Sequence, residues 1–386
     1  MTELRLLADD LTGAMDTAAQ FVGLTGPVTV HWGEADVPAP GSVAIDGGTR
    51  EGDAVTADAT VARWARLLHP ADGTLAYLKL DSLLRGHAGR EIAGCLADGA
   101  FRHCLVAQAF PFQGRVTRHG RQWAHFDAGW SLVGEDIAAT LVGLGHKVVR
   151  ARAGDPVPPG ISLWDAETEN DLDRIAAAGR ALGPAVLWCG SGGLAGALAG
   201  RHPVPFDQQP FPLRPLLGLF GTDHPVTRAQ LDAAGAFTLR ARDGGAIAPF
   251  VHRRLQTQNV ALVAFDPPTG ASRRDAAAWI ERQLAALTRR LDRPGGLLAG
   301  GGETVRSLCR VLGATSIEVT GRIIPGVPRA RLRGGRWDGT DLISKSGAFG
   351  DAGLLFRLVA GSPVDRPAPF ARSSATTAPL LEDRHP

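Results

Sequence analysis

The chain has 386 residues, of which 44% are hydrophobic and 21% charged, and its formal net charge is +2. This length predicts two domains, and the near-neutral charge argues against nucleic acid or an anionic membrane as a partner. No apolar run reaches the roughly 18 residues of a membrane-spanning helix, and Met1 leads into the first apolar run without a signal-peptide layout. The cysteines form no C-x-x-C pair, which fits a cytoplasmic protein without a disulfide framework or a protein-bound metal.

Short apolar runs in the N-terminal half alternate with polar loops and with segments of helical spacing. The first run, residues 4–8, leads into two acidic residues and a helix that Asp10 or Thr12 would cap. The other predicted strands cover residues 28–30, 42–45, 75–78, 104–107, 147–150, 161–165 and 185–189. The predicted helices cover residues 54–68, 88–96, 133–144, 171–181 and 193–197, and residues 116–130 form a loop or short hairpin. Strand, polar loop and helix in repeated order predict an open α/β fold with a mainly parallel sheet.

Residues 202–215 contain five prolines without hydrophobic periodicity. This segment predicts a linker between one α/β domain at residues 1–201 and a second at residues 216–361. Residues 362–386 have the composition of a loose tail. The predicted strands of the second domain cover residues 216–220, 259–265, 296–299 and 342–345, and its helices begin near residues 228, 274 and 305. Residues 318–328 suggest a strand followed by a proline-fixed loop.

Three polar loops of the first domain follow predicted strands. They are Asp9-Asp10, the stretch Lys79-Leu-Asp-Ser-Leu-Leu-Arg-Gly-His87, and Gln113-Gly-Arg115. Ligands of open α/β sheets bind outside the carboxyl ends of the strands, so we expect these loops to form one cleft. Carboxylates beside lysine and arginine suit a small hydroxy acid. Taken alone, the 79–87 stretch could equally be a solvated turn with a surface ion pair.

A glycine-rich turn, Gly300-Gly-Gly-Glu-Thr304, precedes a predicted helix in the second domain. Such a turn lets backbone N–H groups approach an anion, and the helix dipole favours negative charge there. The turn is not a Walker A loop, and the chain carries no G-x-S-x-G elbow. A hydroxy-acid site facing a phosphate site predicts phosphoryl transfer to an alcohol. Magnesium would then arrive with the nucleotide, because the sequence shows no cluster of metal ligands.

These motifs together resemble the four-carbon acid sugar kinase family. The resemblance rests on Asp9-Asp10-Leu-Thr-Gly-Ala-x-Asp16, Lys79-x-Asp-Ser-x-Leu-Arg-Gly86, Phe110-Pro-x-Gln-Gly-Arg115, Gly301-Gly-Glu-Thr304, and Pro325-Gly-Val-Pro328 followed by Lys345-Ser-Gly-x-Phe-Gly350. It implies an N-terminal domain that binds a sugar acid and a C-terminal domain that binds ATP with Mg²⁺, the active site lying in the cleft between them. The chain departs from the family at Leu83, where a threonine is usual, and at Thr222, where a serine is usual.

The expected site residues follow from these motifs. Asp10 is the predicted base for the acceptor hydroxyl, with Asp81 as the second candidate. The predicted substrate-binding residues are Asp9, Lys79, Ser82, Arg85, Gly86, Gln113, Gly114 and Arg115. The predicted nucleotide-binding residues are Thr222, His224, Gly301, Gly302, Glu303, Thr304, Gly326, Lys345, Gly347 and Gly350.

Three alternatives remain at this point. The substrate could be a branched or keto acid such as 3-oxo-isoapionate. The chain could bind a sugar acid without catalysing turnover. The third alternative is acyl or glycosyl transfer with Asp9 and Asp81 as an acid pair, but this chemistry gives the glycine loops of the second domain no role. The sequence does not determine the substrate's stereochemistry, the carbon that is phosphorylated, or whether copies of the chain associate.

Overall fold

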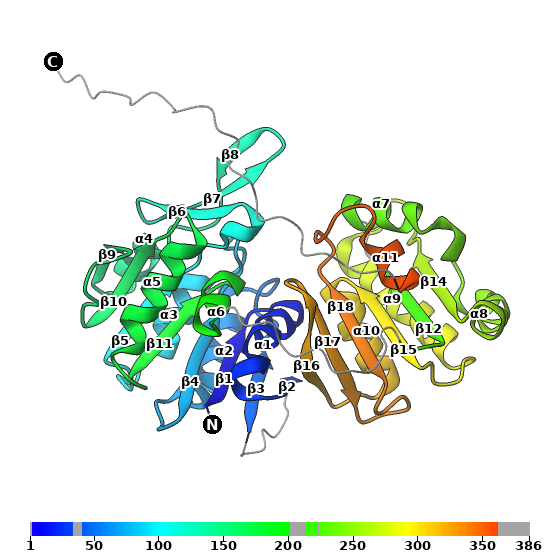
Figure 1. The fold of residues 1–386 in the computed structure, drawn as a ribbon, viewed down its shortest axis with the longest axis horizontal. Helices are drawn as coiled ribbons and strands as arrows, with labels where there is room; N and C mark the ends of the chain where they lie inside the picture. Colours follow the sequence, from blue (N-terminus) through cyan, green and yellow to red (C-terminus); the bar gives the residue numbers. More distant parts are fainter. Residues whose placement is uncertain (1, 34–40, 201–212, 222–223, 362–386) are drawn as a thin grey trace.

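The computed structural model describes residues 2–33, 41–200, 213–221 and 224–361. Its strands form a 15-stranded sheet that runs through both halves of the molecule, and a separate three-stranded sheet (Figure 1). The order of the large sheet is β13-β14-β12-β15-β18-β17-β16-β2-β3-β1-β4-β11-β5-β10-β9. The predicted α/β class with a mainly parallel sheet is confirmed.

The N-terminal half, residues 2–200, contributes eight parallel strands to the large sheet. They are β1 (Glu3–Ala8), β2 (Val28–Trp32), β3 (Ser42–Asp46), β4 (Thr74–Lys79), β5 (His103–Ala107), β9 (Val148–Arg152), β10 (Gly160–Asp165) and β11 (Val186–Gly190). Its helices are α1 (Leu11–Thr25), α2 (Ala54–Trp64), α3 (Ala88–Cys95), α4 (Ile137–Gly143), α5 (Glu169–Arg180) and α6 (Gly192–Leu198).

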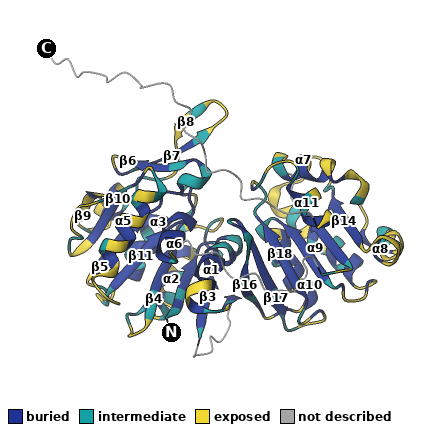
Figure 2. Ribbon diagram, in the orientation of Figure 1, coloured by how far each residue is buried: buried dark blue, intermediate teal, exposed yellow. Residues whose placement is uncertain are grey.

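Alternation along the strands places helices on both faces of this part of the sheet. Leu6 and Ala8 of β1 face a core that includes α1, α5 and α6, whereas Leu7 faces a second core with α2, α3 and α4. Successive side chains of a strand point to opposite faces, so two-sided burial requires these nearly continuous apolar runs. Figure 2 shows the strands of this half as mostly buried.

The C-terminal half, residues 213–361, repeats the same architecture. Its strands are β12 (Leu216–Phe220), β13 (Thr238–Ala241), β14 (Val260–Phe265), β15 (Gly296–Gly300), β16 (Ser316–Ile324), β17 (Val327–Arg333) and β18 (Asp341–Lys345). Its helices are α7 (Pro225–Ala233), α8 (Gly244–Gln258), α9 (Arg273–Thr288), α10 (Gly302–Leu312) and α11 (Leu354–Ala360). Strands β13, β14, β12, β15 and β18 are parallel, whereas β16 and β17 are antiparallel to their neighbours.

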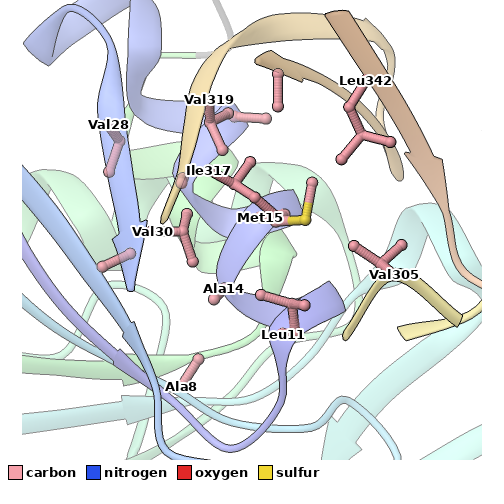
Figure 3. Packing of buried hydrophobic residues seen from close by; sticks show 14 of the residues in the cluster. Ala8, Leu11, Ala14, Met15, Val28, Val30, Val305, Ile317, Val319 and Leu342 are labelled. Carbon is pink, nitrogen blue, oxygen red and sulfur yellow. The ribbon is translucent and has the colours of Figure 1, made fainter. Parts of the chain in front are cut away.

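The two halves are joined by the antiparallel pairing of β16 with β2, where Ile317, Glu318 and Val319 face Val30, Thr29 and Val28. Buried side chains of both halves meet around this seam, as Figure 3 shows for Met15, Val305 and their neighbours. The sequence did not predict a shared sheet. The predicted linker lies mostly outside the described residues, and the predicted tail lies entirely outside them.

Several predicted elements need correction. Residues 116–130 belong to a three-stranded antiparallel sheet, β6 (Arg115–Arg118), β7 (Arg121–Phe126) and β8 (Gly129–Leu132), so the hairpin prediction missed a strand. Helix α4 begins at Ile137 instead of residue 133, because Asp136 caps it by accepting from the N–H of Ala139. The expected proline-fixed loop is the tight turn of a β16–β17 hairpin, where Gly326 has a φ of 84°. Strand β13 and helix α8 were not predicted.

Candidate active site

A cavity of about 1540 Å³ lies between the two halves. Its walls include the loops that follow β1, β4 and β5 in the N-terminal half, and those that follow β12, β15 and β18 in the C-terminal half. These loops lie at the carboxyl ends of the strands, where open α/β sheets bind their ligands. The cavity therefore brings together most of the loops that the sequence singled out.

Arg50 lies at the centre of the acidic groups in the N-terminal half. Its Nε and Nη2 donate to the two carboxylate oxygens of Asp9 at 2.7 and 2.8 Å, and Nη2 lies 2.6 Å from Asp10 Oδ1 and 3.5 Å from Asp81 Oδ1. Burial opposes the charge of the guanidinium, but the three carboxylates outweigh burial and raise the pKa of Arg50. Arg50 therefore stays charged and fixes the three acids around one cation.

The sequence prediction missed Arg50, although the loop that carries it offered a signal. Asp46 ends β3 and residues 47–50 follow it directly; this segment is polar and glycine-bearing, like the three loops that were selected. Strand β3 is the parallel neighbour of β1, which brings the two loops to the same edge of the sheet. The prediction of converging loops was right, but one of their members was left out.

The 79–87 stretch contains an ion pair, Asp81 with Arg85, and a separate buried lysine, Lys79. Asp81 accepts from Nε and Nη2 of Arg85 at 2.6 and 2.9 Å, and also from the backbone N–H of Arg85 at 3.1 Å. Burial would raise the pKa of Asp81, but these bonds and the nearby Arg50 lower it far below its usual range. Lys79 is buried, and its Nζ donates to the carbonyl of Leu80 at 2.7 Å. Asp81 is thus a tightly held anion.

Arg115 is a half-buried cation of a different kind. Its Nη1 donates to Ser82 Oγ and to Gln113 Oε1, and it forms no ion pair with any carboxylate of the described residues. Burial lowers its pKa to about 10. Removing a charge from water costs free energy unless a counter-ion is present. This guanidinium is therefore suited to binding an anion in the cavity.

Helix α10 directs its N-terminus into the cavity. Gly301 precedes it with a φ of 91°, a conformation that favours glycine, and donates its N–H to the carbonyl of Lys345 at 2.9 Å. Thr304 is buried and accepts from the N–H of Gly221 at 3.2 Å, whereas the side chain of Glu303 is 62% exposed. The first N–H groups of a helix lack intrahelical partners, so this end of α10 suits an anion.

The N-terminus of α10 touches the N-terminus of α1. A Cβ atom added to Gly302 would lie 2.5 Å from Thr12 Oγ1 and 3.7 Å from Asp10 Oδ2. Asp10 caps α1 by accepting from the N–H of Gly13 at 2.8 Å. The acid cluster of one half and the glycine turn of the other are therefore in direct contact across the cavity.

A second contact between the halves lies at Asp16. Its Oδ1 accepts from the N–H of Gly326, in the β16–β17 turn, at 2.9 Å. Burial raises the pKa of Asp16 above its usual value. Gly326 had been predicted to bind nucleotide, but this N–H is already bonded to Asp16. The turn thus fixes the orientation of the two halves beside the cavity.

The structure does not place Lys345 in the cavity. The side chain is fully buried and its Nζ donates to Thr227 Oγ1 and to the carbonyl of Ser346, both at 2.9 Å. Burial lowers its pKa to about 8. From the sequence alone, a lysine at a strand end is a candidate phosphate ligand. Here its Nζ instead points into the protein interior, where it donates to Thr227 of α7.

The other predicted residues divide as follows. Those that line the cavity are Asp9, Asp10, Lys79, Asp81, Ser82, Arg85, Gln113, Arg115, His224, Gly301, Gly302, Glu303, Thr304, Gly326, Gly347 and Gly350. Gly86 and Gly114 do not line it, and Thr222 lies outside the described residues. The ring of His224 also serves as the cap of α7, accepting from the N–H of Val226 at 3.3 Å.

No set of three or more His, Cys, Asp or Glu side chains in the described part of the chain is placed to hold a metal ion. A Mg²⁺ ion that arrives with a nucleotide needs only one or two carboxylates besides the phosphates and water. The cavity offers such groups in Asp10, which lies beside Gly302, and in Glu303 of the first turn of α10. None of the helices in the described ranges is long and apolar enough to cross a membrane.

Two family models match the chain, one to each half. Residues 4–141 match the sugar-binding N-terminal domain, and residues 217–355 match the nucleotide-binding C-terminal domain. A solved structure described as a putative tRNA synthase from Salmonella typhimurium LT2 superposes with a TM-score of 0.72 at 20% identity, covering 92% of this chain and 98% of that one. This likeness concerns the fold alone.

Curated relatives match along almost the whole chain. A D-threonate kinase of Bordetella bronchiseptica is 30% identical over 399 residues, covering 91% of this chain and 95% of the relative. A D-erythronate kinase of Heliobacterium modesticaldum is 26% identical over 424 residues, with 91% and 95% covered. The paired domain matches and these relatives confirm the resemblance seen in the motifs: the chain belongs to the four-carbon acid sugar kinase family.

Proposed function

We propose that this protein transfers the γ-phosphoryl group of ATP to a hydroxyl of a short sugar acid. The observation that carries this proposal is the contact between the α10 N-terminus and the Asp10 loop. An anion held at Gly301 and Gly302 would lie next to a carboxylate that can orient a hydroxyl. Phosphoryl transfer needs mainly such positioning and the neutralisation of charge.

The N-terminal half would bind the acid. Arg115 offers a half-buried guanidinium without a carboxylate partner among the described residues, and Ser82 and Gln113 hold it in place. Such a fork suits the carboxylate of a sugar acid, since guanidinium and carboxylate can form two parallel hydrogen bonds. We therefore assign acid binding to residues 1–201, an assignment that the sugar-binding family match at residues 4–141 supports.

The C-terminal half would bind ATP. The N–H groups of the first turn of α10 and the positive end of its dipole favour the polyphosphate. The nucleotide-binding family match at residues 217–355 supports assigning this role to residues 216–361. Glu303 would help to hold a Mg²⁺ ion that arrives with the phosphates, and that ion would neutralise part of their negative charge.

In the proposed step, the oxygen of the acid's hydroxyl forms a bond to the γ-phosphorus. The bond between that phosphorus and the β–γ bridging oxygen breaks, and ADP leaves with the electron pair. The hydroxyl proton passes to Asp10. Asp10 is the better candidate for this base than Asp81, because Arg85 engages both carboxylate oxygens of Asp81 and lowers its pKa strongly.

A coupled assay of ADP release tests this function. The full-length protein receives ATP, Mg²⁺ and, in turn, D-threonate, D-erythronate, their enantiomers and 3-oxo-isoapionate. We expect one or more acids to stimulate ADP release, and Asp10→Asn to lower kcat by about 100-fold or more. Asp58→Asn, a change at an exposed ion pair outside the cavity, is the control and should retain activity. Binding of an acid in calorimetry without ATP binding or turnover would instead identify a non-catalytic binding protein.

A further inference from the structure

The proposed transfer would place negative charge at the phosphate end of the cavity, and Lys345 does not reach it. Among the arginines of the C-terminal half that line the cavity, Arg240, Arg273 and Arg310 pair with Asp266, Glu51 and Glu281, and Arg228 is exposed. Arg306 behaves differently. It projects from α10, lines the cavity, and pairs with Asp46 of the opposite half.

The position of Arg306 on α10 directs it toward the end of the helix that would hold phosphate. Arg306 lies four residues, about one turn, after Gly302. Side chains of an α-helix tilt toward its N-terminus, so a long arginine covers the turn before its own Cα. The Nε of Arg306 lies 4.0 Å from Glu303 Oε1 in the first turn, so the side chain extends toward the N-terminus of α10.

In the N-terminal half, the carboxylate of Asp46 and the backbone at Gly48 contact this guanidinium. Asp46, the last residue of β3, is fully buried at its side chain; its Oδ2 accepts from Arg306 Nη2 and its Oδ1 from the N–H of Gly48 at 2.9 Å. A Cβ added to Gly48, which has a φ of 66°, would lie 3.0 Å from Arg306 Nη1. A side chain at position 48 would push the guanidinium away from this backbone, and the positive φ also favours glycine there.

The same loop also carries Arg50. Residues 46–50 thus hold Arg306 at one end, through Asp46, and place Arg50 against Asp9, Asp10 and Asp81 at the other. The exposed side chain of Arg273 also reaches this loop, at Glu51, but such a pair contributes little. The Asp46–Arg306 pair is the buried link from this loop to α10.

We propose that Arg306 contacts the phosphoryl group during its transfer, and that Asp46 is the positioning residue that presents it. This inference rests on the proposed kinase function. As the bond between the γ-phosphorus and the β–γ bridging oxygen breaks and the bond to the acid's hydroxyl forms, negative charge on the phosphoryl oxygens would be met by the Arg306 guanidinium. An arginine in this role can raise kcat by several orders of magnitude.

The test uses the full-length protein with ATP, Mg²⁺ and the most active acid. We expect Arg306→Gln to lower kcat by about 100-fold or more while KM for the acid stays within about threefold. Asp46→Asn should lower kcat by about tenfold, because the guanidinium persists but loses its anchor. Arg289→Gln removes an exposed cation at the end of α9, outside the cavity, and should keep the wild-type kcat.

Two further variants separate this role from a loss of folding. Arg306→Gln combined with Asp46→Asn removes both charges, so no buried carboxylate is left unpaired, and kcat should remain as low as in Arg306→Gln. In Arg306→Ala, added guanidinium ion should restore part of kcat, an effect that a merely structural arginine would not show.

Three results would overturn the inference. The first is an active wild type with a kcat of Arg306→Gln within about threefold of it. The second is an equal loss of kcat in Arg289→Gln, and the third is an Arg306→Ala enzyme that added guanidinium does not rescue. An inactive wild type with every acid would overturn the proposed function itself, and this inference with it. The first assay in the series, on the wild type, distinguishes the two failures.

Discussion

The acidic side chains of this cavity are arranged around arginines, and Arg50, which the sequence prediction missed, contacts three of them. Asp9 is 3% exposed and receives two hydrogen bonds from Arg50. Removing one member of such a pair leaves a buried charge without a partner, which costs more than the pair itself contributes. Arg50 is therefore expected to support both the fold and the site.

Arg50→Gln should lower the free energy of unfolding by about 3 kcal/mol at neutral pH, because Asp9 is left buried and unpaired. Urea denaturation followed by circular dichroism measures this change. Arg90→Gln is the matched control, since Arg90 pairs with Asp58 at the surface, and its unfolding midpoint should equal that of the wild type. Equal midpoints for Arg50→Gln and the wild type would contradict this view of the cluster.

Glu91 predicts a pH dependence of stability. It is buried on α3 and accepts from Thr49 Oγ1; burial, with the nearby Asp9, raises its pKa from 4.5 to about 7. The folded state then keeps a proton that the unfolded chain has lost, so this group's contribution to stability is present below pH 4.5 and is lost as the pH rises through about 7.

Glu91→Gln stays neutral and escapes this loss. The difference in unfolding free energy, variant minus wild type, should therefore rise between pH 5 and pH 8. Urea denaturation at several pH values measures it. A difference in unfolding free energy that is constant over this range, or that falls with pH, would contradict a raised pKa of Glu91 in the folded protein.

At the scale of elements, the site depends on two helix N-termini that meet. Gly302 allows this contact, because a methyl group there would approach Thr12 Oγ1 to 2.5 Å. Gly302→Ala should lower kcat/KM by about tenfold or more by displacing α10 from Asp10. The control is Gly23→Ala within α1, where an added Cβ meets nothing within 4 Å. It should stabilise the protein by about 0.5–1 kcal/mol and leave kcat/KM unchanged.

The order of strands, polar loops and helices could be predicted because a strand that is buried on both faces has to be a short run of apolar residues. The predicted convergence of Asp9, Asp81 and Arg115 followed from that order alone. The inward turn of Lys345 could not be predicted, since it depends on Thr227, a residue 118 positions earlier that packs there only in the folded chain. Arg306 lay inside a predicted helix, and nothing local distinguished it from a surface arginine.

At the scale of the whole molecule, the halves share a core around the β2–β16 seam. Ile317 is fully buried there, next to α1 and β2 (Figure 3). Ile317→Ala should cost about 2–5 kcal/mol and should lower the temperature of a single calorimetric transition. Val142→Ala, at a side chain that is 60% exposed, should shift it little. Two separate transitions in the wild type, with only one moved by Ile317→Ala, would mean that the halves unfold independently.

The central claim is that a phosphoryl group passes across the cavity from ATP to a hydroxyl of a short acid. Phosphorus-31 NMR of the full-length protein with ATP, Mg²⁺ and each acid of the panel follows this transfer directly. We predict that, with at least one acid, a phosphate-monoester resonance of that acid grows at the rate at which ADP appears, and that it grows about 100-fold or more slowly with Asp10→Asn. ATP that stays intact with every acid, or that yields only inorganic phosphate, would contradict the claim.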